Sequence, residues 1–261
     1  MQTVLVAGGA GFIGSHLCQR LLNDRYSVIC VDNFITGEKR NISELLKNGN
    51  FELIEKDIIN ISKSDLPKAD FIFNLASPAS TNAKSPRSYM AFPIETLLVN
   101  SQGTHNLLEA ARAGSSRFLY VSTSEVYGDP TVSPQREDYF GNVNPNGVRA
   151  VYDESKRFGE AITCAYNRKY GLDTRIVRIF NTYGPKMRAD DGRVVSNFIT
   201  QAINNKPLTI YGDGSQTRSF CFITDMIDGL ISAMFNDSLK GEVVNIGNPD
   251  ERKIAEIAEL I

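Results

Sequence analysis

Two side chains four residues apart, Tyr152 and Lys156, could together perform acid–base chemistry. A helix would bring both to one face, because residues four apart in a helix are neighbours. A lysine ammonium favours a nearby phenolate, so we expect Lys156 to lower the pKa of Tyr152. Such a tyrosine can take the proton of a substrate hydroxyl while hydride leaves the same carbon, and Thr123 can orient that oxygen. An exposed helical pair would show the same spacing, so this interpretation needs a cofactor site elsewhere in the chain.

A glycine-rich segment near the start of the chain predicts that cofactor site. Gly8, Gly11 and Gly14 lie between an apolar run at Val4–Ala7 and a helical pattern. Gly8 permits a tight turn, Gly11 lets backbone N–H groups approach a pyrophosphate, and Gly14 lets the helix pack on the strand. Asp32 ends the next apolar run, 18 residues after Gly14. A carboxylate there accepts hydrogen bonds from a ribose 2′-hydroxyl and repels a 2′-phosphate, which predicts NAD as the cofactor.

The elements that must position these residues alternate along the first 180 residues. Apolar runs predict strands, and apolar residues at helical spacing predict helices between them. The predicted strands are Val4–Ala7, Ser27–Val31, Phe51–Glu55, Phe71–Leu75, Phe118–Ser122 and Thr174–Arg178, and the predicted helices are Phe12–Asn23, Ile94–Ala113 and Ser155–Tyr170. Repeated strand–helix–strand units imply an α/β fold, a doubly wound parallel (Rossmann) sheet covered by helices on both faces.

The pattern changes after Asn181, where turn signals become frequent. We predict a Rossmann domain at residues 1–180 and a small substrate-binding cap, mainly residues 181–261, with segments that return to the main sheet. The helices expected in this part are Ser196–Asn205, Thr224–Asn236 and Asp250–Ile261, and the short strands are Leu208–Tyr211 and Val243–Ile246. The last helix has no C-cap signal, so we expect the cap to be incomplete at its C-terminus.

The composition is that of a globular protein and argues against several classes of function. The 261 residues are 42% hydrophobic and 22% charged, with a net charge of −2. No basic excess suggests a nucleic-acid partner, and no apolar run approaches the roughly 18 residues of a membrane span. Four widely separated cysteines predict free thiols in a reducing compartment, here the cytoplasm. With two histidines in the chain, we expect no metal site.

Several segments, in order along the chain, resemble the extended short-chain dehydrogenase/reductase family that acts on nucleotide sugars. Besides the glycine motif and the Thr123, Tyr152 and Lys156 set, they include Asp32–Gly37 and Asn181–Pro185. Within this family the chain resembles in particular the UDP-glucuronate decarboxylases, also called UDP-xylose synthases. The segments that carry this likeness are Leu75–Ser80, Ser122–Pro130, Val143–Pro145, Asp191–Phe198 and Gly214–Arg218.

The resemblance implies a set of site residues. The implied cofactor-binding residues are Gly8, Gly11, Phe12, Ile13, Gly14, Asp32, Asn33, Asp57, Leu75, Tyr152 and Lys156, although Asp57 could equally be a turn aspartate. The implied catalytic residues are Thr123, Glu125, Tyr152 and Lys156. The implied substrate-binding residues are Ser77, Ser124, Asn181, Arg193, Tyr211 and Arg218, although Tyr211 could equally be a core residue. The resemblance also suggests a homodimer formed through the helices at 94–113 and 155–170.

The implied reaction is an NAD-dependent conversion of UDP-glucuronate to UDP-xylose. It comprises oxidation at C4 of the sugar, loss of CO2 from the resulting β-keto acid, protonation at C5 and reduction at C4. The alternatives are a 4,6-dehydratase or a 4-epimerase acting on a sugar nucleotide such as dTDP-glucose or UDP-glucose, or a non-catalytic NAD-binding regulator.

Two neighbouring positions bear on these alternatives. By resemblance, 4,6-dehydratases have an acid where this chain has Ser124, and 4-epimerases typically lack Glu125. Glu125 could position the sugar or relay a proton to C5, or it could simply be a buried glutamate paired with an arginine. The segment Thr81–Ser88 is a few residues longer than the family pattern, and its Lys84 or Arg87 could alter the choice of substrate.

Overall fold

The computed structural model describes residues 1–62 and 64–261. Its centre is a seven-stranded sheet in which every neighbouring pair of strands is parallel. The spatial order is β10-β6-β5-β4-β1-β2-β3, and the strands are β1 (Thr3–Ala7), β2 (Ser27–Asp32), β3 (Phe51–Glu55), β4 (Phe71–Asn74), β5 (Arg117–Thr123), β6 (Thr174–Ile179) and β10 (Val243–Ile246). The order reverses beside β1, which is the pattern of a doubly wound sheet and confirms the predicted fold class.

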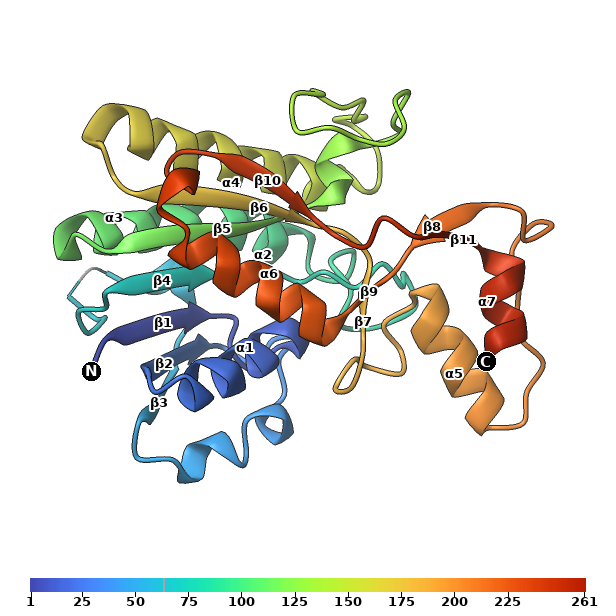
Figure 1. Ribbon diagram of the computed structural model, residues 1–261, viewed down its shortest axis with the longest axis horizontal. Helices are drawn as coiled ribbons and strands as arrows, with labels where there is room; N and C mark the ends of the chain where they lie inside the picture. The colour runs from blue at the N-terminus through green and yellow to red at the C-terminus, as the bar shows by residue number, and fades with distance from the viewer. Residues whose placement is uncertain (63) are drawn as a thin grey trace.

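Helices cover both faces of this sheet (Figure 1). One layer consists of α1 (Phe12–Asn23) and α6 (Ile223–Phe235), which pack their apolar residues against β1, β2 and β5. The other layer consists of α2 (Pro93–Leu98), α3 (Thr104–Gly114) and α4 (Ala150–Tyr170). The two apolar cores lie on opposite faces of the strands because alternate residues of a strand point to opposite sides.

Two of these helices differ from their predicted bounds. The helix predicted at Ile94–Ala113 is present as α2 and α3, joined without a break by a π-helical turn at Val99–Gly103. The helix expected from Ser155 begins earlier, at Ala150, so Tyr152 lies in its first turn. Short 3-10 helices lie at Lys39–Asn41, Leu45–Lys47, Ile58–Asn60, Ser124–Tyr127 and Asp237–Leu239.

The rest of the chain after β6 forms a smaller layer beside the carboxyl ends of the strands (Figure 1). It contains α5 (Val194–Ile203) and α7 (Ile254–Leu260). Two small two-stranded sheets accompany them: β7 (Thr182–Tyr183) with β9 (Cys221–Phe222), and β8 (Thr217–Ser219) with β11 (Glu251–Lys253). Between these segments the chain returns to the main sheet through α6 and β10.

Two predictions for this smaller layer are wrong. The strand expected at Leu208–Tyr211 is irregular, because the side chain of Gln201 bonds both the backbone N–H and the hydroxyl of Thr209, each at 3.0 Å. The helix expected from Asp250 begins only at Ile254. The preceding residues pair instead with β8, and Glu256 caps the new helix start at the N–H of Lys253.

Candidate active site

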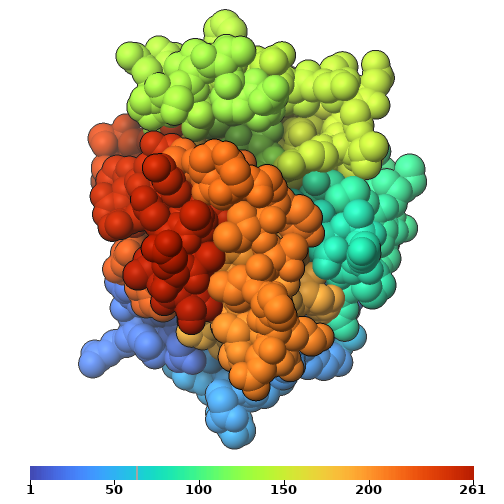
Figure 2. Space-filling model, turned by 90° about the vertical axis from the view of Figure 1, so that its right-hand side faces the viewer, coloured from blue at the N-terminus to red at the C-terminus, as the bar shows by residue number. Residues whose placement is uncertain are grey.

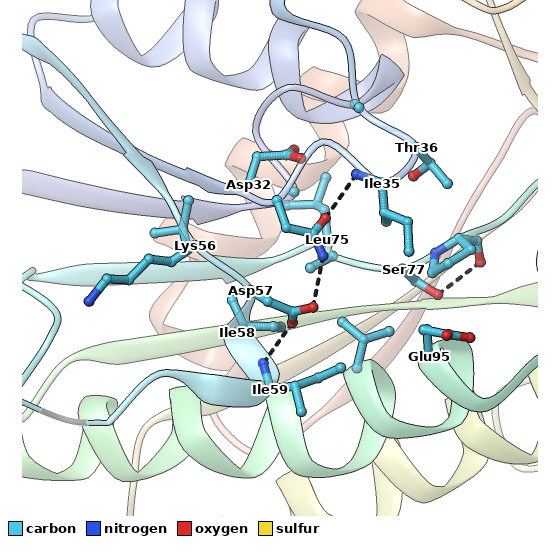
Figure 3. A pocket seen from close by; sticks show the side chains of 18 residues that line it. Asp32, Ile35, Thr36, Lys56, Asp57, Ile58, Ile59, Leu75, Ser77 and Glu95 are labelled. Atoms are coloured by element: carbon cyan, nitrogen blue, oxygen red, sulfur yellow. Dashed lines mark hydrogen bonds between the residues drawn. The ribbon is translucent and has the colours of Figure 1, made fainter. Parts of the chain in front are cut away.

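A cleft runs along the carboxyl ends of the strands and consists of two adjoining pockets. The first lies over β1, β2 and β3 (Figure 3), and the second lies over β5 and β6 and extends to the smaller layer. Gly8, Gly11, Thr36, Leu75 and Ser77 line both pockets, so the two form one continuous cleft. Such an edge is where ligands bind in open α/β sheets.

The glycine turn between β1 and α1 has the geometry that the sequence predicted. Gly8 has φ +80°, and a Cβ there would lie 2.9 Å from backbone atoms of Leu75 and Ala76. A Cβ on Gly14 would lie 2.1 Å from the carbonyl oxygen of Gly8, so glycine is needed for the helix to pack on the turn. Gly11 lies immediately before α1 and faces the cleft.

The start of α1 also fits the pyrophosphate of a dinucleotide. The helix has no side-chain cap and no acidic residue in its first turn. Phe12, Ile13 and Gly14 of that turn line the second pocket. The free backbone N–H groups and the positive end of the helix dipole therefore point toward the cleft and suit an anion.

Asp32 lies at the end of β2, on the wall of the first pocket (Figure 3). Its carboxylate accepts hydrogen bonds from the backbone N–H groups of Ala10 at 2.9 Å and Phe34 at 2.8 Å. Burial raises its pKa, and these two bonds oppose the rise. The carboxylate is therefore fixed in orientation, and each oxygen retains a lone pair for a ligand hydroxyl.

Asn33 also lines this pocket, and Asp57 lies further along it (Figure 3). The amide of Asn33 donates to the carboxylate of Asp57 at 2.9 Å, and the other carboxylate oxygen accepts the N–H of Ile59, also at 2.9 Å. Asp57 is thus a capping aspartate, the alternative considered from the sequence, and it also lines the cleft, while its contact with a cofactor stays a prediction.

Thr123, Tyr152 and Lys156 come together in the second pocket. Thr123 ends β5, while Tyr152 and Lys156 project from α4, and all three are buried. The ammonium of Lys156 donates to the carbonyl of Val121 at 2.9 Å and lies 5.9 Å from the centre of the Tyr152 ring.

The expected effect of Lys156 on Tyr152 is wrong for this structure. Burial raises the pKa of Tyr152, and the charge of Arg193 and a hydrogen bond from Thr123 only partly oppose the rise. Burial also lowers the pKa of Lys156 to about 7, although Glu160 favours its charged form. Desolvation is therefore the largest influence on the pKa of the phenol and on that of the ammonium.

Ser124 and Glu125 follow Thr123 at the edge of the same pocket. The carboxylate of Glu125 forms an ion pair with Arg149, which lies just before α4. Glu125 is thus paired with an arginine, the structural role considered from the sequence, and it faces the cleft as well. Sequence reasoning missed Arg149, because no pattern connects it to a residue 24 positions earlier.

The substrate residues predicted in the second half of the chain divide into two groups. Asn181 and Arg193 line the second pocket, as does Ser77. Arg193 donates to the carboxylate of Asp191 at 2.7 Å and to the carbonyl of Ala79 at 2.9 Å.

Tyr211 and Arg218 do not join them. Tyr211 is 78% exposed, Arg218 is an exposed residue of β8, and neither lines the cleft. Their assignment to the substrate stays a prediction.

The segment Thr81–Ser88 borders the cleft through Thr81 and Arg87. Arg87 donates to the carboxylate of Glu38 at 2.9 Å, and Arg188 donates to the same oxygen at 3.2 Å. Sequence reasoning singled out Arg87 but missed Glu38 and Arg188, which lie in two other loops.

A family model described as the NAD dependent epimerase/dehydratase family matches residues 4–247 of this chain. The chain therefore belongs to that family, which confirms the resemblance found in its motifs. UDP-glucuronic acid decarboxylase 1 of Danio rerio is 50% identical over 258 residues, which are 99% of this chain and 59% of that protein. UDP-glucuronic acid decarboxylase 5 of Arabidopsis thaliana is 48% identical over 259 residues, 99% of this chain and 73% of that protein.

Solved structures of related enzymes share the fold. UDP-glucuronic acid 4-epimerase from Bacillus cereus, in complex with UDP-glucuronic acid and NAD, superposes with a TM-score of 0.83 at 33% identity, covering 97% of this chain and 80% of that chain. The dTDP-glucose 4,6-dehydratase DesIV from Streptomyces venezuelae, with NAD bound, superposes with a TM-score of 0.86 at 29% identity, covering 99% of this chain and 80% of that chain.

The described part of the chain shows two further features that bear on function. No helix in it is long and apolar enough to cross a membrane. Nor do its histidine, cysteine and acidic side chains include a cluster of three that could hold a metal ion.

Proposed function

We propose that this chain carries the cofactor and catalytic sites of an NAD-dependent UDP-glucuronate decarboxylase that forms UDP-xylose. The observation that carries the proposal is the side-chain set at the second pocket: Thr123, Tyr152 and Lys156 with Ser124 and Glu125 beside them. A serine at position 124 cannot expel a hydroxyl as an acid would, which disfavours a dehydratase. The decarboxylase relatives, at 48% and 50% identity, support the same substrate.

The two pockets suggest a division of labour along the chain. We propose that residues 1–180 hold the cofactor and that residues 181–261 mainly hold the sugar nucleotide. The first pocket is lined only by residues from the first part, whereas the second also receives Asn181, Lys186 and Arg193 from the second part. Figure 2 views the face on which this later part lies, next to the segment that follows β5.

In this proposal the glycine turn and the start of α1 bind the pyrophosphate of NAD, and Asp32 accepts the ribose hydroxyls. Bound NAD supplies the oxidation and the later reduction at C4 of the sugar. Tyr152 takes the proton of the C4 hydroxyl and returns it, while Thr123 holds the same oxygen. Arg193 is the cation whose charge most lowers the pKa of Tyr152, so it favours the phenolate during this step.

The experiment that tests this function is direct product analysis. The protein is incubated with UDP-glucuronate and NAD, and the nucleotide sugars are separated and weighed by mass spectrometry. We expect a product lighter by CO2 that co-elutes with UDP-xylose, without net NADH. Unchanged UDP-glucuronate, together with an epimer or loss of water from UDP-glucose or dTDP-glucose, would assign the chain to another branch of the family.

Tyr152→Phe is the matched variant for this assay. Removal of one hydroxyl deletes the proposed base and leaves the ring in place, so we expect turnover to fall by about a thousandfold or more. NAD binding, measured by the protection of the protein against thermal unfolding, should persist. A variant that turned over UDP-glucuronate at an undiminished rate would exclude Tyr152 as the base.

We also propose a homodimer. Exposed apolar side chains gather on α2 and α4, the two helices that the resemblance assigns to the dimer contact: Ile94, Leu97, Leu98 and Phe158. Such a surface is typical of a protein–protein contact. We further propose a cytoplasmic location, which the four unpaired thiols support because cytoplasmic thiols stay reduced.

A further inference from the structure

A small network of charged side chains joins three separate loops beside the second pocket. The carboxylate of Glu38, in the loop after β2, accepts hydrogen bonds on one oxygen from Arg87 at 2.9 Å and from Arg188 at 3.2 Å. Arg87 lies between β4 and α2, and Arg188 lies in the loop after β7. All three side chains line the second pocket. Glu38 therefore links the three loops through a single carboxylate.

The segments that carry the two arginines are also bonded to each other. Arg188 donates to both carboxylate oxygens of Asp190, at 2.9 and 2.7 Å, and the hydroxyl of Ser85 donates to one of these oxygens at 3.0 Å. The side-chain amide of Asn82 donates to the backbone carbonyl of Asp190 at 3.1 Å. The extended segment, which contains Asn82 and Ser85, and the loop of Arg188 are therefore held together as one unit.

The place of this network follows from the order of the strands. In the sheet, β1, β4 and β5 lie between β2 and β6. A contact between the loop after β2 and the loop that follows β6 and β7 therefore spans the ends of these three strands. Gly11, after β1, and Thr123, at the end of β5, line the same pocket, so the network lies across the cleft. The backbone N–H of Glu38 donates to the carbonyl of Ala10 at 3.1 Å, which places the network beside the glycine turn.

The exposure of these ion pairs suits a contact that opens and closes. The side chain of Glu38 is 17% exposed, that of Arg188 22% and that of Arg87 37%. Fully exposed ion pairs contribute little, whereas breaking a buried pair is very costly. Pairs of intermediate exposure can hold two loops together and still separate by a local motion, without unfolding of the sheet.

The proposed reaction gives such a contact a use. Hydride leaves C4 of the sugar in the first step and returns to C4 in the last, so the cofactor is unchanged after each turnover. Release of the reduced cofactor between these steps would leave the sugar as a ketone. A site that runs this reaction therefore gains from holding its cofactor through many turnovers.

We propose that Glu38, Arg87 and Arg188 form an ionic latch across the cleft, which opens for NAD to enter or leave and stays closed during turnover. The use of the latch, though not its geometry, rests on the proposed function. The latch also gives the extended segment Thr81–Ser88 a role, because this segment supplies Arg87. The three side chains are positioning residues, since they hold loops across the cleft and touch no reacting atom.

The first test measures cofactor exchange without a sugar nucleotide. Protein loaded with NADH, whose fluorescence reports binding, is mixed with excess NAD in a stopped-flow instrument. Loss of two part-buried ion pairs in Glu38→Gln should speed NADH release about tenfold, and loss of one in Arg87→Met about fivefold. Entry of NADH into Arg87→Met should be faster by a similar factor, because a latch slows entry and exit alike. Its Kd should therefore change less than about threefold.

Arg40→Met is the matched control. Arg40 donates to the other oxygen of the Glu38 carboxylate at 2.7 Å, but it lies in the same loop and is 76% exposed, so this pair joins nothing across the cleft. Its release rate should stay within about 1.5-fold of wild type. Release less than twofold faster in Glu38→Gln, or as fast in Arg40→Met as in Arg87→Met, would overturn the latch. Faster release from Arg87→Met with an unchanged rate of entry would also overturn it, since Arg87 would then bind the cofactor directly.

The second test uses turnover. Protein is loaded with NAD, separated from unbound NAD and given UDP-glucuronate. Wild type should continue to form UDP-xylose, whereas Arg87→Met should lose turnover with time and recover it when NAD is added. A loss that added NAD does not restore would overturn the latch, because Arg87 would then act on the sugar. If NADH release changes as expected while the wild type converts no UDP-glucuronate, the latch is supported and the proposed function is rejected.

Discussion

Two arginine–carboxylate groups lie at the helix α4, and they differ in how completely they are bonded. Arg178 meets Glu160 with two hydrogen bonds of 2.9 and 2.7 Å, and Ser122 adds a third to the same carboxylate at 2.6 Å. Both charged side chains are 12% exposed. Near the start of the helix, Arg149 forms an ion pair with Glu125 in which the side chains are 51% and 34% exposed. Buried, fully bonded charges hold structure in place, whereas a half-exposed ion pair contributes little to stability.

The bonded pair also fixes a long segment of chain. The third guanidinium nitrogen of Arg178, Nη1, donates to the hydroxyl of Tyr127 at 2.9 Å and to the carbonyl of Glu137 at 3.1 Å. The hydroxyl of Tyr127 in turn donates to Asn245 of β10 at 2.8 Å. The segment between η5 (Ser124–Tyr127) and α4 is thereby fastened to the edge of the sheet. Arg149, at the end of that segment, can then hold Glu125 in place.

The largest expected loss of stability comes from breaking the ion pair of Arg178 and Glu160. Arg178→Met leaves the carboxylate of Glu160 buried without its cation, which costs about 3–5 kcal/mol of unfolding free energy. Urea unfolding at pH 7 measures this loss. The double variant Arg178→Met/Glu160→Gln should recover part of it, because the uncompensated charge is gone. If Arg178→Met cost less than about 1 kcal/mol, the two pairs would not differ in the way described.

A smaller effect concerns Lys156, which lies between the two groups. Its folded-state pKa of about 7 is below the value near 10.4 of an unfolded chain, so between these values the unfolded state binds more protons. Stability therefore rises with pH through this window, by at most about 1.4 kcal/mol per pH unit from this group.

Denaturant unfolding at pH 7, 8 and 9 measures the rise, and Lys156→Met should remove this contribution. The two proteins should therefore differ by about 2–3 kcal/mol in how much their stability changes between pH 7 and pH 9. Parallel stability curves would show that Lys156 keeps an ordinary pKa.

Local patterns predicted much of the fold and of the first pocket. The glycine turn is identified by three residues and the strand and helix beside them, and Asp32 by its place at the end of β2. Both signals are local in the sequence. The residues meet in the structure because the carboxyl ends of parallel strands lie at one edge of the sheet. Where a segment bonds to residues outside it, prediction failed: Thr209 bonds to Gln201 of the preceding helix, and residues 251–253 pair with β8.

The second pocket depends on contacts with residues outside the local sequence. Arg149, Glu38 and Arg188 reach the site from loops whose sequences show no periodicity, so their partners follow only from the folded chain. The pKa of Tyr152 illustrates the same limit. The spacing of Tyr152 and Lys156 predicted a lowered value, but burial, which spacing does not reveal, raises it.

The smallest expected loss of stability comes from breaking the other ion pair, that of Arg149 and Glu125. Arg149→Met removes an ion pair whose side chains are 51% and 34% exposed, so the free energy of unfolding should fall by no more than about 1 kcal/mol at pH 7. Turnover of UDP-glucuronate should nevertheless fall at least tenfold, because Glu125 loses its orientation. Burial and the charge of Glu125 raise the pKa of Asp153 to about 6 and Arg149 opposes the rise, so without this cation the pKa of Asp153 should be higher. Urea unfolding, product analysis and carboxyl titration of the same preparation measure the three outcomes. A large loss of stability with turnover retained would reverse the assignment of the two pairs.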